Sequence, residues 1–113
     1  MDMQTQFTLS GRVASIGEGF VKGIARIINN EAESDKIQAG DIMIAPQTDI
    51  NFVPALELCV GLVTEQGGRF CHAAIYSREN DLPCITDVEN ARQIIPDGAE
   101  IILDTTNNTI SLA

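Results

Sequence analysis

The chain has 113 residues with 7 basic and 16 acidic side chains, a net charge of −9, and 44% of its residues are hydrophobic. This length and composition predict one folded domain over residues 1–113 and exclude a disordered chain. The acidic balance and the absence of any basic run exclude nucleic acid and anionic membranes as partners, and no apolar run approaches the roughly 20 residues of a membrane span.

The first half of the chain is rich in strand patterns. Loosely alternating apolar residues predict a strand over residues 7–13, and a β-branched run predicts a second over 20–28. The polar residues 31–38 are typical of a loop or a helical turn. Residues 42–45 then predict a buried strand ended by Pro46, and residues 49–58 predict a helix that tolerates Pro54 in its first turn.

In the second half, helices alternate with strands. We expect a strand over residues 60–64, a break at Gly67 and Gly68, a helix over 71–79 and a strand over Cys84–Thr86. A short helix over 89–94 precedes two last strands, 99–104 and Thr109–Leu112, joined across Asn107 and Asn108. Because the apolar strands lack clean alternation, this pattern predicts a mixed α/β domain whose sheet is covered on both faces.

The cysteines and the first residues bear on the cellular compartment. Cys59, Cys71 and Cys84 are odd in number and form no CxxC pair, which predicts reduced thiols rather than disulfides or a zinc site. Residues 1–6 have neither a basic stretch nor an apolar segment, so we expect no signal peptide and a cytoplasmic protein.

His72 is the sole histidine and the one residue with a chemical argument around it. It follows Gly67, Gly68, Arg69 and Cys71 at the start of the predicted helix, where glycines allow close backbone approach and unpaired N–H groups favour an anion. A neutral imidazole can attack phosphorus, and the positive helix end favours both the neutral ring and the anionic product. These features predict His72 as a phosphoryl-accepting nucleophile. Phosphate would be bound by Gly67, Gly68, Arg69 and Cys71.

Other roles for His72 remain open on these features alone. A lone histidine on a helix is commonly a structural residue. Metal binding is disfavoured because no carboxylate or cysteine partner stands at ligand spacing. A catalytic dyad of Cys71 and His72 is also disfavoured, since adjacent helical residues point about 100° apart.

A known family shows the same motifs in the same order. Residues 67–79 read GGRFCHAAIYSRE and are followed by Leu82 and Pro83. This string resembles the phosphohistidine motif of the phosphoenolpyruvate-utilising enzymes, which include phosphoenolpyruvate synthase, pyruvate phosphate dikinase and enzyme I of the sugar phosphotransferase system. Further matches are the glycine-spaced opening (Gly11, Ser15, Gly17, Gly23), the run 40–45, Thr48 with Asp49, residues 52–55, and Asp97, Gly98 and Asp104.

The resemblance covers residues 11–112 and implies both fold and function. It implies an α/β fold, specifically a swivelling β/β/α three-layer phosphohistidine domain with mixed sheets and a helix that starts near the motif histidine. His72 would carry phosphate between a nucleotide-binding domain and a domain that binds phosphoenolpyruvate or pyruvate. Mg²⁺ and ATP are expected on those partner domains or subunits and no cofactor on this chain alone, which would be one component of a phosphotransferase.

Several departures from the family pattern keep alternatives open. Phe70 replaces the threonine that regulatory kinases modify in some dikinases, so that regulation is not expected here. Ser77 and Asp81 replace an alanine and a glycine, and the glycine that usually follows the next strand is absent near Thr86 and Asp87. The alternatives are a non-catalytic swivelling-fold subunit for assembly or regulation, and a small subunit of an unrelated enzyme with this fold.

Overall fold

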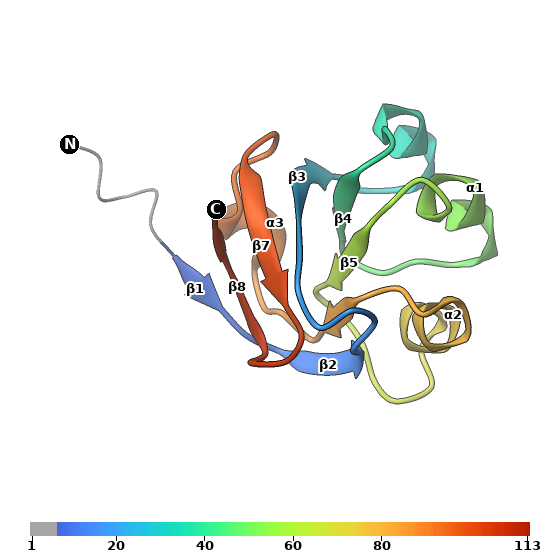
Figure 1. Cartoon of the computed structure of the whole chain (residues 1–113). Helices are drawn as coiled ribbons and strands as arrows, with labels where there is room; N and C mark the ends of the chain where they lie inside the picture. The colour runs from blue at the N-terminus through green and yellow to red at the C-terminus, as the bar shows by residue number, and fades with distance from the viewer. Residues whose placement is uncertain (1–6) are drawn as a thin grey trace.

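Residues 7–113, which the computed structural model describes, form one mixed sheet and a few short helices (Figure 1). The expectation about residues 1–6 lies outside the described residues. The strands are β1 (Thr8–Leu9), β2 (Arg12–Ser15), β3 (Val21–Ile27), β4 (Asp41–Ala45), β5 (Gly61–Thr64), β6 (Cys84–Thr86), β7 (Glu100–Asp104) and β8 (Thr109–Leu112). The α-helices are α1 (Val53–Leu56), α2 (His72–Asn80) and α3 (Ala91–Ile94), with 3₁₀ turns η2 (Glu31–Lys36) and η3 (Ile50–Phe52).

The strand order explains the shape of the sheet. It runs β1-β8-β7-β3-β4-β5-β6-β2, with β3 to β6 parallel and the remaining pairs antiparallel. Strands β1 and β2 stand at opposite ends of this order, yet only Ser10 and Gly11 separate them in the chain. Two residues span only about 10 Å between the flanking strands, so the sheet curls until its two ends meet, and its strands form two layers.

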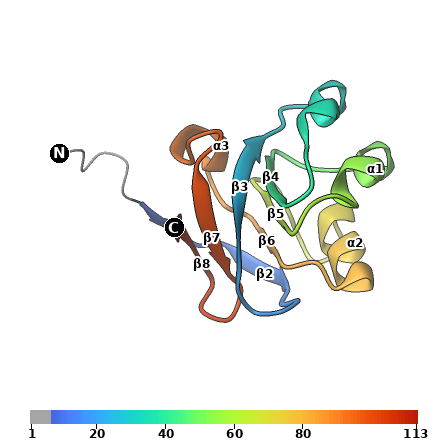
Figure 2. The same cartoon turned by 45° about the horizontal axis from the view of Figure 1, so that its top comes forward.

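Two apolar cores lie on the two faces of the parallel strands. Strand β4 is buried along its whole length; Ile42 and Ile44 face one core, while Met43 and Ala45 face the other. The first core lies inside the curl with α3, and the second lies under α1 and α2, on the right in Figure 1. The sheet is therefore covered on both faces, as predicted, in a β/β/α arrangement that Figure 2 shows with the top of the molecule turned forward.

Two predicted elements differ from the observed ones. The single strand predicted over residues 7–13 is two strands, because the N–H and the carbonyl of Gly11 bond the side chain of Asn108 at 3.2 and 2.9 Å. The predicted helix 49–58 is a 3₁₀ turn followed by one α-helical turn. Asp49 Oδ1 accepts a 2.9 Å bond from Asn51 N to start it, and Pro54 lies in the first turn of α1, as expected.

The remaining expected elements are confirmed with small shifts at their ends. The polar stretch 31–38 is the 3₁₀ turn η2, and α2 runs one residue further than predicted at its C-terminus. The third helix begins only at Ala91 because Asn90 adopts a left-handed backbone with φ of 61°. No helix within residues 7–113 is long and apolar enough to cross a membrane.

Candidate functional site

The site begins where α2 begins. Cys71 is the N-cap, with extended backbone, and its Sγ accepts a 3.4 Å hydrogen bond from the N–H of Ala74. His72 is the first helical residue, one position after the predicted start of this helix. The N–H groups of a first helical turn have no intrahelical acceptor, so His72 lies beside backbone donors that can bind an anion.

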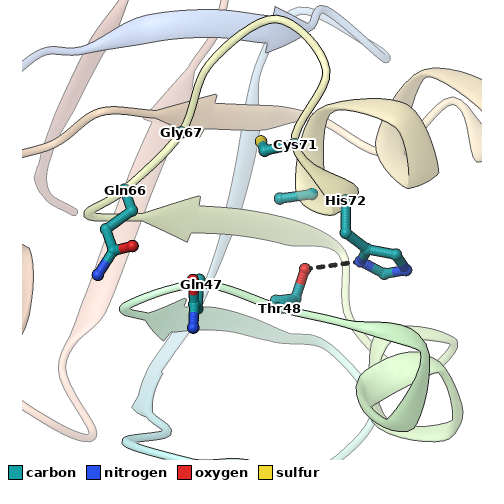
Figure 3. A pocket seen from close by; sticks show the side chains of 7 residues that line it. Gln47, Thr48, Gln66, Gly67, Cys71 and His72 are labelled. Atoms are coloured by element: carbon teal, nitrogen blue, oxygen red, sulfur yellow. Dashed lines mark hydrogen bonds between the residues drawn. The ribbon is translucent and has the colours of Figure 1, made fainter.

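Two side chains hold the imidazole of His72. Its Nδ1 lies 2.9 Å from the hydroxyl oxygen of Thr48, which is only 8% exposed. The ring stacks on Tyr76, one turn further along α2, with centroids 5.9 Å apart and planes 22° apart. Figure 3 shows Nδ1 facing Thr48, while the other ring nitrogen points away from it. The ring is half-buried and its orientation is fixed at one nitrogen.

A pocket of about 270 Å³ opens beside this ring. It is lined by Gln47, Thr48, Gln66, Gly67, Cys71, His72 and Ala73. Thr48 follows β4, and Gln66 and Gly67 follow β5 (Figure 3), so the pocket lies at the carboxyl ends of two neighbouring parallel strands. Ligand sites in open α/β sheets commonly occupy this edge.

The two glycines before the helix have different structural roles. A Cβ on Gly67 would overlap the carboxylate of Asp87 and lie 2.8 Å from the Cβ of Thr86, so Gly67 permits close packing on the end of β6. Gly68 has φ of +114°, a conformation that side chains rarely adopt. Asp87 itself has φ of 61°, so the left-handed turn after β6 forms without the glycine that the family pattern contains.

The structure separates the five predicted site residues into two groups. Gly67 and Cys71 line the pocket together with His72. Gly68 and Arg69 instead line a smaller hollow on the other side of the loop, and the side chain of Arg69 is exposed. Thr48 was not predicted as a site residue, although the Thr48-Asp49 string had been matched to the family. No local pattern indicated that it contacts a ring 24 positions away.

The remaining cysteines are outside this site. Burial raises the pKa of both Cys59 and Cys84 to about 12, which keeps these thiols protonated and unreactive at neutral pH. Among residues 7–113, no group of three or more His, Cys, Asp or Glu side chains is arranged to hold a metal ion.

Fold and site together define a small β/β/α domain that presents one histidine at the start of a helix. Comparison with known proteins identifies its family: the chain belongs to the family described as PEP-utilising enzyme, mobile domain, which matches residues 37–108. The resemblance stated from the sequence motifs, and with it the swivelling-domain fold, is confirmed. The chain is thus a mobile domain of the kind found in PEP-utilising enzymes.

Among curated relatives, the phosphoenolpyruvate synthase of Pseudomonas aeruginosa is 39% identical over 84 residues, covering 74% of this chain and 11% of the relative. The rifampicin phosphotransferase of Bacillus subtilis is 37% identical over 97 residues, covering 86% of this chain and 11% of the relative. The chain spans about a tenth of the length of these relatives, so it corresponds to one domain of multidomain proteins.

Solved structures agree on the fold. A chain of aconitase X from Thermococcus kodakaraensis matches with a TM-score of 0.69 at 12% identity, covering 95% of this chain and 98% of that one. An NMR structure of Enzyme I matches with a TM-score of 0.58 at 21% identity, covering 70% and 33%. At these identities the likeness concerns the fold alone.

Proposed function

We propose that this chain is a phosphoryl carrier in which Nε2 of His72 accepts a phosphoryl group from one partner domain and delivers it to another. The donor side would be a nucleotide-binding domain or subunit, and the acceptor side one that binds phosphoenolpyruvate or pyruvate. The observation that carries the proposal is the half-buried His72 ring at the start of α2, with Nδ1 bonded to Thr48 and Nε2 directed away from it.

The hydrogen bond to Thr48 selects the reactive nitrogen. When Nδ1 carries the proton and donates it to the Thr48 hydroxyl oxygen, Nε2 holds the free lone pair. Nε2 then attacks phosphorus: an N–P bond forms, the bond from phosphorus to the leaving oxygen breaks, and that oxygen keeps the electron pair. In delivery, the N–P bond breaks and its electron pair returns to Nε2 as an acceptor oxygen binds phosphorus. Nδ1 keeps its proton throughout.

The surroundings of His72 suit a phosphoryl group that binds reversibly. The first-turn N–H groups of α2 and its dipole favour the phosphoryl oxygens. The side-chain amides of Gln47 and Gln66, which line the pocket, add neutral donors. A neutral lining binds the phosphoryl group without the strong ion pairs that would slow its release.

The partner would determine the substrate. Two relatives with this domain are a phosphoenolpyruvate synthase and a rifampicin phosphotransferase, whose names indicate different phosphoryl acceptors. The carrier step at His72 can be common to both, with acceptor choice belonging to the rest of each protein. ATP and Mg²⁺ remain an expectation for the partner domains.

A non-catalytic role in assembly predicts a different environment for His72. A purely structural histidine is expected to be fully buried with both ring nitrogens bonded to protein. Within residues 7–113, the hydrogen bond of this ring is the one through Nδ1, and the side chain is half-buried. These observations support the carrier role.

The proposal is tested by labelling. The purified chain is incubated with ³²P-phosphoenolpyruvate and candidate partner subunits, and we expect an acid-labile, base-stable label on it. The label should be lost in His72→Ala and retained in Phe70→Ala, the matched control, whose exposed side chain lies two positions away and outside the pocket. Label that persists in His72→Ala, or no label with any donor, would overturn the proposal.

A further inference from the structure

Three arginines from separate parts of the chain meet beside the histidine loop. Arg12 on β2, Arg69 on the loop and Arg78 on α2 line one hollow of about 150 Å³, with Val13, Ala14, Gly68 and Ala74 completing its walls. We call these seven residues the arginine hollow. Its lining contains no acidic side chain, although the chain as a whole carries a net charge of −9.

These arginines differ from the other cations of the described chain. Within residues 7–113 the ion pairs are Arg26 with Asp41, Lys36 with Glu33, and Arg92 with Glu65. None of the three arginines in the hollow takes part in an ion pair there. Three cationic residues that line one hollow without a carboxylate leave its positive charge uncompensated, and an anion from outside would neutralise it.

The hollow is built by rigid elements. Strand β2 is tied to α2 by the hydrogen bond from Ser15 Oγ to the carbonyl of Ser77, at 3.2 Å. The loop is tied to α2 by Arg78 Nη2, which donates to the carbonyl of Arg69 at 2.9 Å. The arginine side chains therefore project from a fixed frame, although each is itself exposed to solvent.

We propose that the arginine hollow binds a phosphate-bearing anion, separately from the phosphoryl group on His72. Guanidinium forks match phosphate oxygens in bidentate pairs, and a hollow of this volume suits one or two phosphate groups rather than a nucleoside. The loop around Gly67 and Gly68 separates this hollow from the histidine pocket, since Gly67 lines the histidine pocket and Gly68 lines the arginine hollow.

The position gives the anion a role that rests on the proposed function. An anion in the arginine hollow lies one loop away from the transferring group, so it would be a phosphate that is not being transferred. Two sources share this chemistry: free orthophosphate, and the diphosphate part of a phosphoryl donor. Binding itself does not depend on phosphorylation of His72, so the two proposals can fail separately.

The test is an NMR titration of the ¹⁵N-labelled chain at constant ionic strength, using orthophosphate, diphosphate and malonate, with chloride as the reference. With diphosphate, we expect saturable shifts of the side-chain Nε–H signals of Arg12, Arg69 and Arg78 and of the Gly68 amide. The same shifts with orthophosphate would show that a single phosphate suffices, and shifts with diphosphate alone would point to a diphosphate group. Binding should weaken at least about tenfold in the double variant Arg12→Gln/Arg78→Gln, which loses two charge-assisted contacts.

Two further variants control for charge and location. Lys22→Gln removes an exposed cation on β3 that lies outside the hollow, and it should bind as the unaltered chain does. His72→Ala should also retain binding, because His72 does not line the hollow. The proposal is overturned if diphosphate gives no saturable shifts beyond those with chloride, or if malonate binds as tightly as diphosphate. It is also overturned if Lys22→Gln weakens diphosphate binding as much as the double arginine variant does, or if His72→Ala abolishes it.

Discussion

At the scale of single residues, the hydrogen bond between Thr48 and His72 decides which ring nitrogen is available. The sequence motif locates His72 and its glycines because they are contiguous, and the glycines are required by a close approach at Gly67 and a positive φ at Gly68. Thr48 reaches the ring from the end of the neighbouring strand β4, so no local spacing could reveal it.

Replacing Thr48 with valine removes this bond while keeping the side-chain shape. We expect Thr48→Val to fold normally and to slow phosphorylation of His72 about 10- to 100-fold, because a lost hydrogen bond of about 1–3 kcal/mol no longer holds Nδ1 and orients Nε2. Thr48→Ser keeps the hydroxyl and should react close to the normal rate. The measurement is the rate of phosphohistidine formation; equal rates for the serine and valine variants would show that the bond has no such role.

At the scale of secondary-structure elements, local patterns predicted most strands and the helix α2, but not how the sheet closes. The turn at Asn107 and Asn108 was predicted between the last two strands. Its contact with Gly11, 97 positions away, was not, since nothing in either segment encodes the other. This contact splits the predicted strand over residues 7–13 and joins the two ends of the curled sheet.

Asn108→Ala tests that closure. The substitution removes two hydrogen bonds to Gly11 and places alanine at φ of 60°, so we expect a loss of about 2–3 kcal/mol in the free energy of unfolding. Asn107→Ala is the matched control: Asn107 is exposed and its side chain bonds only Asp104 three residues earlier, so about 1 kcal/mol or less is expected. Urea denaturation measures both, and equal losses would contradict the role given to Asn108.

At the scale of the whole molecule, the half-buried Cys59 and the buried Cys84 link stability to alkaline pH. Burial raises the pKa of Cys59 and Cys84 from about 9 to about 12 in the folded chain. A raised folded-state pKa gives stability that is complete below the unfolded value and is lost as pH rises toward the folded value. The sensitive window is therefore pH 9–12.

We expect the free energy of unfolding to fall by about 1 kcal/mol per thiol between pH 8.5 and 10. Urea denaturation across this range measures the slope. The double variant Cys59→Ala/Cys84→Ala will differ in absolute stability, but its stability should decline less steeply with pH. The decline that remains includes a contribution from Tyr76, because burial also raises the pKa of this side chain. An unchanged slope in the double variant would assign the decline to other groups.

The carrier function depends on His72 accepting phosphate at Nε2, the nitrogen that Thr48 leaves free. The most direct measurement needs no partner: the ¹⁵N-histidine-labelled chain is treated with phosphoramidate, a small chemical phosphoryl donor, and followed by ³¹P–¹⁵N NMR. We predict one phosphohistidine, coupled to Nε2 of His72 and missing in His72→Ala. A phosphoryl group on Nδ1, or no adduct at His72 while free imidazole reacts under the same conditions, would contradict the account.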